Sequence, residues 1–235
     1  MDKKIFLRLF YVLFLVPLIL FSTAFFLISS RVRKGFFLSR EQLISFTLSS
    51  IDKLYISQLV CGEDHRFYLH HGCDPIAITR AIIRRLRNGK LEGASTLEQQ
   101  YVRTCTARYE ITLNRKLEEI AISTLLSLSS NKDTIAYSYL KQAFYGHSIT
   151  GINDALIKLQ EVYENKYTGP YESAALISLL KHPFPKVISI QWRIRHTRRL
   201  LYIKNIHEKV FLRHIPIHKS YIYSLSPRLN SLNKS

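Results

Sequence analysis

The sequence predicts a mainly α-helical protein that carries one membrane-spanning helix near its N-terminus. Residues 9–29, LFYVLFLVPLILFSTAFFLIS, form an uncharged apolar run, and a single transmembrane helix needs roughly 20 such residues. Further along the chain, apolar residues recur at helical spacing in several segments. Alternating strand patterns of any length and internal repeats are both missing from the sequence. These observations together indicate a helical fold class.

Length and charge narrow the range of functions. The chain has 235 residues, which is enough for one domain with a good core and an additional anchor or tail. There are 34 Lys and Arg residues against 17 Asp and Glu, a formal net charge of +17. Such a balance predicts an anionic partner, which could be nucleic acid, an acidic membrane face or a phosphorylated substrate.

The apolar run is expected to be a retained transmembrane helix, residues 9–30. The alternative is a cleaved signal peptide, whose apolar core is only about 7–15 residues long, and no small-x-small cleavage site follows the run. Pro17 is tolerated inside a membrane helix. The flanking cations are balanced, so charge leaves the orientation open. We therefore divide the chain into a basic segment (1–8), the span (9–30), a basic linker (31–40), one domain (41–210) and a polar basic tail (211–235).

Helices are predicted along the whole domain. Residues 41–60 carry apolar positions at helical spacing, and residues 75–87 begin with Pro75, which suits a first helical turn. Ser95 with Glu98, and Thr96 with Gln99, fit the S/T-x-x-E/Q capping pattern at the start of another helix. Further helices are expected at 113–129, 132–144, 152–165, 171–181 and 191–210, with a break at HPFP, residues 182–185.

The cysteines are Cys61, Cys73 and Cys105. An odd number excludes a fully paired set of internal disulfides. Two of them flank three histidines, but a CxxC or HxxxH pair is missing. Buried apolar thiols are the more common state, so we expect that rather than a zinc site.

Three polar segments carry candidate chemistry. They are Glu63-Asp64-x-x-Phe67-x-x-His70-x-Gly72-x-Asp74, Gly93-x-Ser95-Thr96-x-x-Gln99-Gln100 and Arg115-Lys116-x-x-Glu119. In the third, the i,i+3 and i,i+4 spacings place both cations on the helical face of Glu119. Each segment alone also has a structural explanation: a hydrogen-bonded surface network, a helix cap or a solvated ion pair. Those explanations do not account for all three in order within one basic, membrane-anchored chain.

The order and spacing of these segments resemble the peptidoglycan glycosyltransferase family, the transglycosylase module of bifunctional penicillin-binding proteins. The chain is most similar to the monofunctional members, which have one N-terminal anchor and lack a transpeptidase domain. Residues 63–74 match the family motif EDxxFxxHxGxD at every fixed position, Ala94 is the one departure from GGSTxxQQ, and RKxxE is fully matched. A fourth motif, KxxILxxYLNxxxFG, is matched in part by Lys132, Ile135, Tyr139, Leu140 and Gly146. The resemblance covers roughly residues 59–185, with a later echo in Glu172, Ala174, Ala175 and Pro183.

Some positions depart from the family pattern. Arg103 stands where the family usually has lysine, which preserves the charge. Ile111 stands where an arginine commonly precedes the third motif, and Arg108 is a nearby substitute at a different spacing. Tyr137 and Lys141 depart from the fourth motif.

The resemblance implies a lysozyme-like, two-lobed helical domain that polymerises lipid II into glycan strands and releases undecaprenyl pyrophosphate. It implies Glu63 and Glu119 as the catalytic carboxylates, with Glu63 as the base. Glu119 would hold the neighbouring cations or a divalent cation, Mg²⁺. The implied substrate-binding and pyrophosphate-binding residues are Asp64, Ser95, Thr96, Gln99, Gln100, Arg103, Arg115 and Lys116. Phe67, His70, Gly72 and Asp74 would support the site.

The family's topology implies a single-pass protein of the bacterial inner membrane, with its body outside the cytoplasm. Its partners would be lipid II, the growing strand, membrane lipids and other proteins of wall synthesis and division. Three alternatives compete. A lysozyme-like hydrolase would use Glu63 and Glu119 as its carboxylate pair, and the departures from the motifs motivate a non-catalytic scaffold of wall synthesis. A nucleic-acid binder is disfavoured, since basic charge alone supports it, and we expect no nucleic-acid partner.

Overall fold

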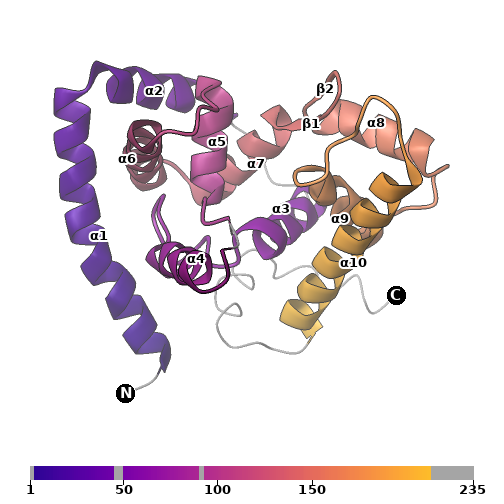
Figure 1. The fold of residues 1–235 in the computed structure, drawn as a ribbon, viewed down its shortest axis with the longest axis horizontal. Coiled ribbons are helices and arrows are strands. Elements are labelled where there is room, and N and C mark those ends of the chain that lie inside the picture. The colour runs from indigo at the N-terminus through magenta and orange to yellow at the C-terminus, as the bar shows by residue number, and fades with distance from the viewer. Residues whose placement is uncertain (1–2, 45–49, 90–92, 213–235) are drawn as a thin grey trace. The chain divides into compact units, whose positions relative to one another are not determined.

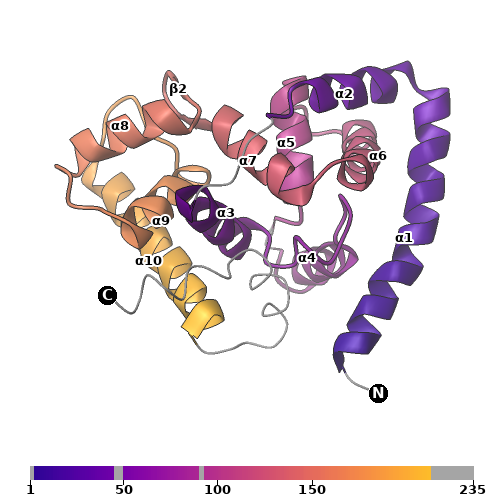
Figure 2. The same ribbon diagram turned by 180° about the vertical axis from the view of Figure 1, so that it is seen from behind.

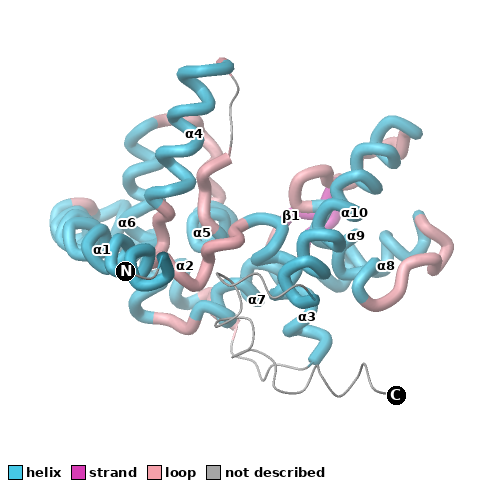
Figure 3. Tube along the Cα trace, turned by 90° about the horizontal axis from the view of Figure 1, so that it is seen from below, coloured by secondary structure: helices cyan, strands magenta, loops and turns pink. Residues whose placement is uncertain are grey.

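The computed structural model describes residues 3–44, 50–89 and 93–212. These residues are mostly helical, as the sequence predicts, with one short hairpin (Figures 1 and 3). The chain forms two compact units, and both are discontinuous in sequence. Of the described residues, the first unit contains 3–44, 66–89 and 93–136, and the second contains 50–65 and 137–212.

Helix α1, Lys3–Ile28, contains the predicted span. Its segment Ile5–Ile28 has a mean hydropathy of 2.5, and by length and composition it could cross a membrane. It begins earlier than predicted and ends at Ile28, because Ser29 caps the next helix by accepting a hydrogen bond from the Val32 N–H at 3.3 Å. One face of α1 lies against α6, Leu113–Ser129 (Figure 1), and large apolar side chains cover much of the rest.

The linker expected at residues 31–40 is instead helix α2, Ser30–Glu41. Its basic composition suggested a linker, but four residues at helical spacing form a buried stripe: Val32, Gly35, Phe36 and Ser39. This stripe faces α6 and helix α5, Leu97–Thr106. An added Cβ at Gly35 would lie 2.6 Å from the Ile122 side chain, so α2 approaches α6 closely.

The first unit is built around α6, Leu113–Ser129, whose bounds match the prediction. α6 packs against α1, α2 and α5, Leu97–Thr106. Helix α4, Pro75–Asn88, also follows its predicted range. The Tyr101 side chain is fully buried and donates to the Ser39 carbonyl at 2.9 Å, which ties α5 to α2. Helix α7, Lys132–Gln142, then leads from the first unit into the second.

The second unit is built around α9, Pro170–Leu179, which is buried on all sides from Ser173 onward. It packs against α10, Ile190–Leu212, and α3, Ser50–Glu63 (Figure 2). Helix α3 replaces the longer helix predicted at 41–60, part of which lies outside the described residues. Helix α8, Ile152–Val162, ends earlier than predicted. The tail predicted at 211–235 lies mostly outside the described residues.

A short antiparallel hairpin was not predicted. It pairs β1, Phe144–Gly146, with β2, Ile149–Thr150. The HPFP segment ends the preceding helix as expected, and its Phe184 bridges to Gly146. Gly146 has φ of +155°, and an added Cβ would lie 2.4 Å from the Phe184 Cβ. Only glycine therefore allows this contact.

The three cysteines are buried free thiols, as expected. Burial raises the pKa of Cys61 and of Cys73 to about 12, and that of Cys105 to about 11. They are therefore protonated and unreactive at neutral pH.

Candidate active site

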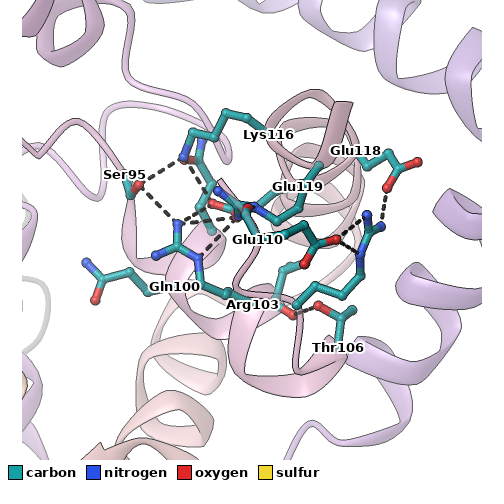
Figure 4. Close-up of polar contacts among 12 residues, drawn as sticks. Ser95, Gln100, Arg103, Thr106, Glu110, Lys116, Glu118 and Glu119 are labelled. Carbon is teal, nitrogen blue, oxygen red and sulfur yellow. Dashed lines mark hydrogen bonds and ion pairs between the residues drawn. The ribbon is translucent and has the colours of Figure 1, made fainter. Parts of the chain in front are cut away.

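A cluster of cations surrounds Glu119 in the first unit (Figure 4). Arg103 of α5 donates from Nη2 to Oε1 of Glu119 at 2.9 Å, and Lys116 Nζ lies 3.0 Å from the same oxygen. Arg115 bonds to the other carboxylate oxygen. Thr112 caps α6 by accepting from the Arg115 N–H at 3.3 Å, and this sets the turn that carries the three motif residues. The Glu119 side chain is only 3% exposed.

Neutral donors and acceptors complete this cluster on its α5 side. Lys116 Nζ lies 2.9 Å from Ser95 Oγ and 2.6 Å from Gln99 Oε1. Arg103 Nη2 also donates to Ser95 Oγ, at 3.3 Å. Burial lowers the pKa of Lys116, although Glu119 acts in the opposite direction. With three cations around one carboxylate, the cluster keeps excess positive charge and suits an anionic ligand.

The Gly72 carbonyl connects the first and second motifs. It accepts hydrogen bonds from Thr96 Oγ1 at 3.0 Å, Gln99 Nε2 at 2.7 Å and Ser123 Oγ at 3.0 Å. Gly72 has φ of +71°, and an added Cβ would lie 2.4 Å from the backbone carbon of Ser123. Only glycine fits there, so the motif's glycine sets the distance between this loop and α6.

A buried ion pair lies beneath the same loop. Lys132 Nζ contacts the carboxylate of Glu98 and donates to the carbonyls of Phe67 at 2.8 Å and His70 at 2.7 Å. The Glu98 side chain also accepts from the Gly72 N–H at 3.3 Å. Both Phe67 and His70 are buried. Sequence reasoning gave Glu98 no role beyond a cap and Lys132 none beyond a motif match.

Asp74 ends the first motif and begins α4. Its Oδ1 accepts from the N–H groups of Ile76 at 3.0 Å and Ala77 at 3.2 Å. Its Oδ2 accepts from Arg66 Nε at 2.8 Å. Burial alone would raise the pKa of Asp74, but the bonds and charge of Arg66 outweigh it and lower that pKa. Asp74 is thus an ionised helix cap.

Glu63 and Asp64 lie in the second unit. Glu63 is the last residue of α3, and its Oε1 accepts from Arg199 Nη2 of α10 at 2.8 Å. The same Nη2 donates to the Gly62 carbonyl at 2.6 Å, so Arg199 fixes both the carboxylate and the end of its helix. Asp64 is buried. Glu63 and Arg199 are 136 positions apart, and local spacing could not have indicated this pair.

The structure therefore groups six of the predicted residues directly: Ser95, Gln99, Arg103, Arg115, Lys116 and Glu119. Thr96 instead caps α5, accepting from the Gln99 N–H at 3.4 Å. The Gln100 side chain points away from Glu119 (Figure 4). Ile111, at the position where an arginine was expected, is 100% exposed, while Arg108 binds Glu110 and Glu118.

The donor set around Glu119 fits a divalent cation poorly. Mg²⁺ prefers carboxylate and phosphate oxygens with several water ligands. Both oxygens of Glu119 already accept bonds from Arg103, Arg115 and Lys116, and a further cation among these three would be repelled. The predicted Mg²⁺ stays a prediction, and we derive no reaction step through it.

A helical fold that carries three half-buried cations around one buried carboxylate has the charge to suit an anionic ligand. The family model described as transglycosylase matches residues 31–205, and the chain belongs to this family. The lysozyme-like helical fold expected for it is therefore confirmed. The match begins at residue 31, which includes α2 rather than leaving it out as a linker.

Curated relatives agree with the family. The chain is 33% identical to penicillin-binding protein 1F of Bacillus subtilis over 141 residues, 58% of this chain and 19% of that protein. It is 30% identical to penicillin-binding protein 1B of Haemophilus influenzae over 196 residues, 80% of this chain and 24% of that protein. The chain thus spans about a fifth of the length of the relatives it matches.

Proposed function

We propose that this protein is a membrane-anchored peptidoglycan glycosyltransferase that polymerises lipid II and releases undecaprenyl pyrophosphate. The observation that carries the proposal is the cluster of Arg103, Arg115 and Lys116 around the buried Glu119. A diphosphate leaving group gains negative charge as its bond to the sugar breaks. Cations that are already fixed in place stabilise that charge without further reorganisation.

The reaction needs one proton acceptor and one anion site. Glu63 takes the proton from the 4-hydroxyl of the incoming disaccharide. The hydroxyl oxygen then bonds to the anomeric carbon with inversion, and the bond from that carbon to the pyrophosphate oxygen breaks. The cationic cluster binds the departing pyrophosphate, and Glu119 holds the three cations in position. Arg199 orients the Glu63 carboxylate through the contact at 2.8 Å.

The membrane location follows from the substrate and from α1. A polyprenyl-linked donor stays in the bilayer, so the enzyme has to work at its surface. The apolar segment Ile5–Ile28 supplies a span of suitable length. We place the catalytic body outside the cytoplasm of a bacterial inner membrane, in contact with lipid II, the growing strand and membrane lipids. Other proteins of wall synthesis and division are further partners under this proposal.

The cluster favours a transferase over a lysozyme-like hydrolase. Hydrolysis of a glycan releases a neutral sugar hydroxyl, so a hydrolase gains nothing from three cations on one carboxylate. A non-catalytic scaffold would also bind an anion at this cluster, but it would make no glycan from lipid II.

The test is polymerisation of labelled lipid II by the detergent-solubilised full chain, with and without Mg²⁺. We expect long glycan from the wild type and none from Glu63→Gln. Glu161→Gln is the matched control, because that carboxylate is exposed and pairs only with Lys158 in the described structure. A folded wild type that binds lipid II but makes no glycan would leave only the scaffold. Shortening of preformed glycan would identify the hydrolase.

A further inference from the structure

Helix α1 lies along the first unit over most of its length, from the start of α4 to α2. We propose that α1 has two mutually exclusive positions, this packed one and one across the bilayer, and that it moves between them about Ser29. This movement rests on the proposed function, because only an α1 that spans a membrane has to leave the first unit.

The packing contact nearest the N-terminus of α1 is a buried hydrogen bond. Tyr11 Oη donates to Asp74 Oδ1 at 2.9 Å, and Tyr11 is only 6% exposed. Asp74 is also paired with Arg66, whose Nη2 lies 2.7 Å from Oδ2. The phenol of Tyr11 therefore holds α1 against the loop of the first motif and places an ion pair beside an otherwise apolar segment.

Further contacts continue this packing toward the C-terminal end of α1. A gap of about 10 Å³ is lined by Phe14 and Leu15 of α1 and by Cys73 of the motif loop, which leaves no room for a ligand. Phe26 packs edge-on against Phe36 of α2, with ring centroids 5.6 Å apart. The first unit thus contacts α1 near both ends of its apolar segment.

This packing is incompatible with a membrane span. Tyr11 and Phe26 are 15 positions apart, about 23 Å along a helix, and the hydrocarbon core of a bilayer is about 30 Å thick. A packed α1 that crossed the bilayer would bring the first unit into the hydrocarbon beside it. The Arg66–Asp74 pair and the arginines of α4 that adjoin Phe10 would enter too, and charged side chains are costly at that depth.

A single residue separates α1 from α2 and can act as the hinge. Helix α1 ends at Ile28, α2 begins at Ser30, and Ser29 has an extended backbone, with φ of −97° and ψ of 115°. The two helices meet there at a corner (Figure 1). A few residues at the end of an element can absorb a hinge rotation. Arg33 holds the corner in the packed position, since its Nη1 donates to the Leu27 carbonyl at 2.7 Å.

The two faces of α1 suit the two positions. Its packed face carries Tyr11, whose hydroxyl has its partner on the first unit. Its opposite face is apolar, with Leu13 74% exposed and Leu20 67% exposed. Moving that exposed face from water into lipid favours insertion, whereas the bond from Tyr11 to Asp74 opposes it. The hydrogen bond is therefore a latch that membrane insertion has to break.

A photoreactive side chain can report which position α1 occupies. p-Benzoylphenylalanine replaces Phe14, whose ring it extends, and the full chain is made in a cell-free reaction with or without liposomes of phosphatidylethanolamine and phosphatidylglycerol. After irradiation, mass spectrometry identifies the crosslinked partner in the monomer-sized product. Without liposomes we expect crosslinks to residues 69–73. In the carbonate-resistant liposome fraction we expect at least tenfold fewer of these and crosslinks to lipid instead.

Two further probe positions test the geometry. Leu15 lines the same gap as Phe14, so a probe there should behave alike if the first substitution disturbs packing. Leu13 lies on the exposed face, so a probe there should not crosslink to residues 69–73 in either sample. A Leu13 probe that reaches this loop as often as the Phe14 probe would overturn the packed position.

The latch has its own test, with the probe kept at position 14. Tyr11→Phe removes the hydroxyl and keeps the ring, so at a limiting amount of liposomes its crosslinks to residues 69–73 should fall at least threefold below the wild-type level. Tyr109→Phe, at an exposed tyrosine of the same unit, should match the wild type. Equal crosslinking in the two variants would show that the Tyr11 bond does not hold α1.

Two results would overturn the movement itself. One is the persistence of crosslinks to residues 69–73 in the carbonate-resistant fraction, and the other is their absence without liposomes at both probe positions. If lipid II is polymerised while α1 stays packed, the movement is wrong and the glycosyltransferase stands. If α1 leaves the first unit in liposomes but the wild type makes no glycan, the movement stands and the proposed function fails.

Discussion

At the scale of single residues, the protein holds its charges in two different environments. Lys158 and Glu161 form an exposed pair on α8, and such pairs contribute little stability because water screens them. Lys132 and Glu98 form a buried pair that also binds the backbone of the motif loop. Removing one partner of a buried pair leaves the other charge without compensation. The two pairs therefore make a matched comparison.

Lys132→Met should destabilise the protein by about 3–5 kcal/mol, because Glu98 would remain charged and buried. Lys158→Met should cost less than about 1 kcal/mol. Urea unfolding followed by far-UV circular dichroism measures both. Equal, small losses in the two variants would mean that the Lys132 contact does not support the loop.

Stability should also fall in mild acid. Burial alone would raise the pKa of Glu98, but Lys132 outweighs burial and holds that pKa below its ordinary value of 4.5. Arg66 does the same for Asp74, whose ordinary value is 3.8. The unfolded chain therefore takes up these protons at higher pH than the folded protein does. The stability from both groups is fully present above about pH 5 and is lost as pH falls through the folded pKa values.

Urea midpoints measured from pH 7 down to pH 3 test this sign. We expect the urea midpoint to fall below about pH 4.5, and to fall less steeply in Lys132→Met, where Lys132 no longer outweighs the effect of burial on the Glu98 pKa. Glu161→Gln, at an exposed carboxylate, should follow the wild-type curve. A Lys132→Met curve parallel to the wild type would contradict the assignment.

The candidate site also depends on a residue that sequence spacing does not reveal. Arg199→Met should lower the polymerisation rate on the order of 10–100-fold, because a misplaced carboxylate is costly in a proton transfer. Arg198→Met changes an exposed neighbour on the same helix and should keep near the wild-type rate. Initial rates with labelled lipid II distinguish the two variants, and equal rates would show that Arg199 does not support the reaction.

The residue scale also explains which contacts were predictable. Arg115, Lys116 and Glu119 are within one helical turn, so their spacing predicted the contact that the structure has. The Gly72 contacts with Thr96 and Gln99 cross 24 and 27 positions. They depend on how the loop packs on α5 and α6, and only the family motif indicated that these residues belong together.

At the scale of elements, two glycines separate the cost of a left-handed backbone conformation from the cost of a steric clash with a neighbouring helix. Gly72 and Gly89 have similar φ values, +71° and +62°. An added Cβ would strike α6 at Gly72, whereas nothing lies within 4 Å at Gly89. Gly89→Ala should therefore cost only the left-handed conformation, about 1–2 kcal/mol.

Gly72→Ala should cost about 1–3 kcal/mol more than Gly89→Ala, since the loop or α6 has to move. It should also reduce polymerisation, because the Gly72 carbonyl binds both Thr96 and Gln99. Urea unfolding and lipid II assays measure the two effects. Equal losses of stability at both glycines would show that the close approach to α6 carries no energetic weight.

Helix α2 shows where element prediction from sequence fails. The buried stripe that includes Val32, Phe36 and Ser39 has helical spacing, so the pattern is present in the sequence. Its basic residues pointed to a linker because charge was given more weight than periodicity. By contrast, α6 was predicted correctly because its apolar spacing runs over 17 residues and a threonine caps its start.

At the scale of the whole molecule, the two units are both discontinuous in sequence. The sequence predicts one domain at 41–210, and the family resemblance implies that it has two lobes, but nothing in composition marks the positions near 44, 65 and 136 where the chain passes between units. At residue 136 the chain passes between units within a continuous helix, α7. Composition detects flexible linkers, and a helix that continues from one unit into the next has no such signal.

The role of α1, as a surface helix or as a membrane span, is also a question at the scale of the whole molecule. In the structure α1 lies against α6, yet Leu13 is 74% exposed and Val16 57% exposed. If α1 were a surface helix, lysines at these two positions would be harmless. If it spans a bilayer, each lysine near the centre costs about 2.5–3.5 kcal/mol of insertion free energy. Leu13→Lys with Val16→Lys should then release the protein from membranes washed with sodium carbonate.

The wild type should stay in the carbonate-resistant fraction, and so should Leu86→Lys, which adds a cation at an exposed position of α4 outside the apolar segment. Electrostatic attachment by the +17 chain is a separate possibility that salt resolves, because the Debye length falls to about 3 Å at 1 M ionic strength. A wild type released by 1 M salt would mean that charge, and not a spanning helix, holds this protein at the membrane. Retention of the double lysine variant in carbonate would equally exclude the span.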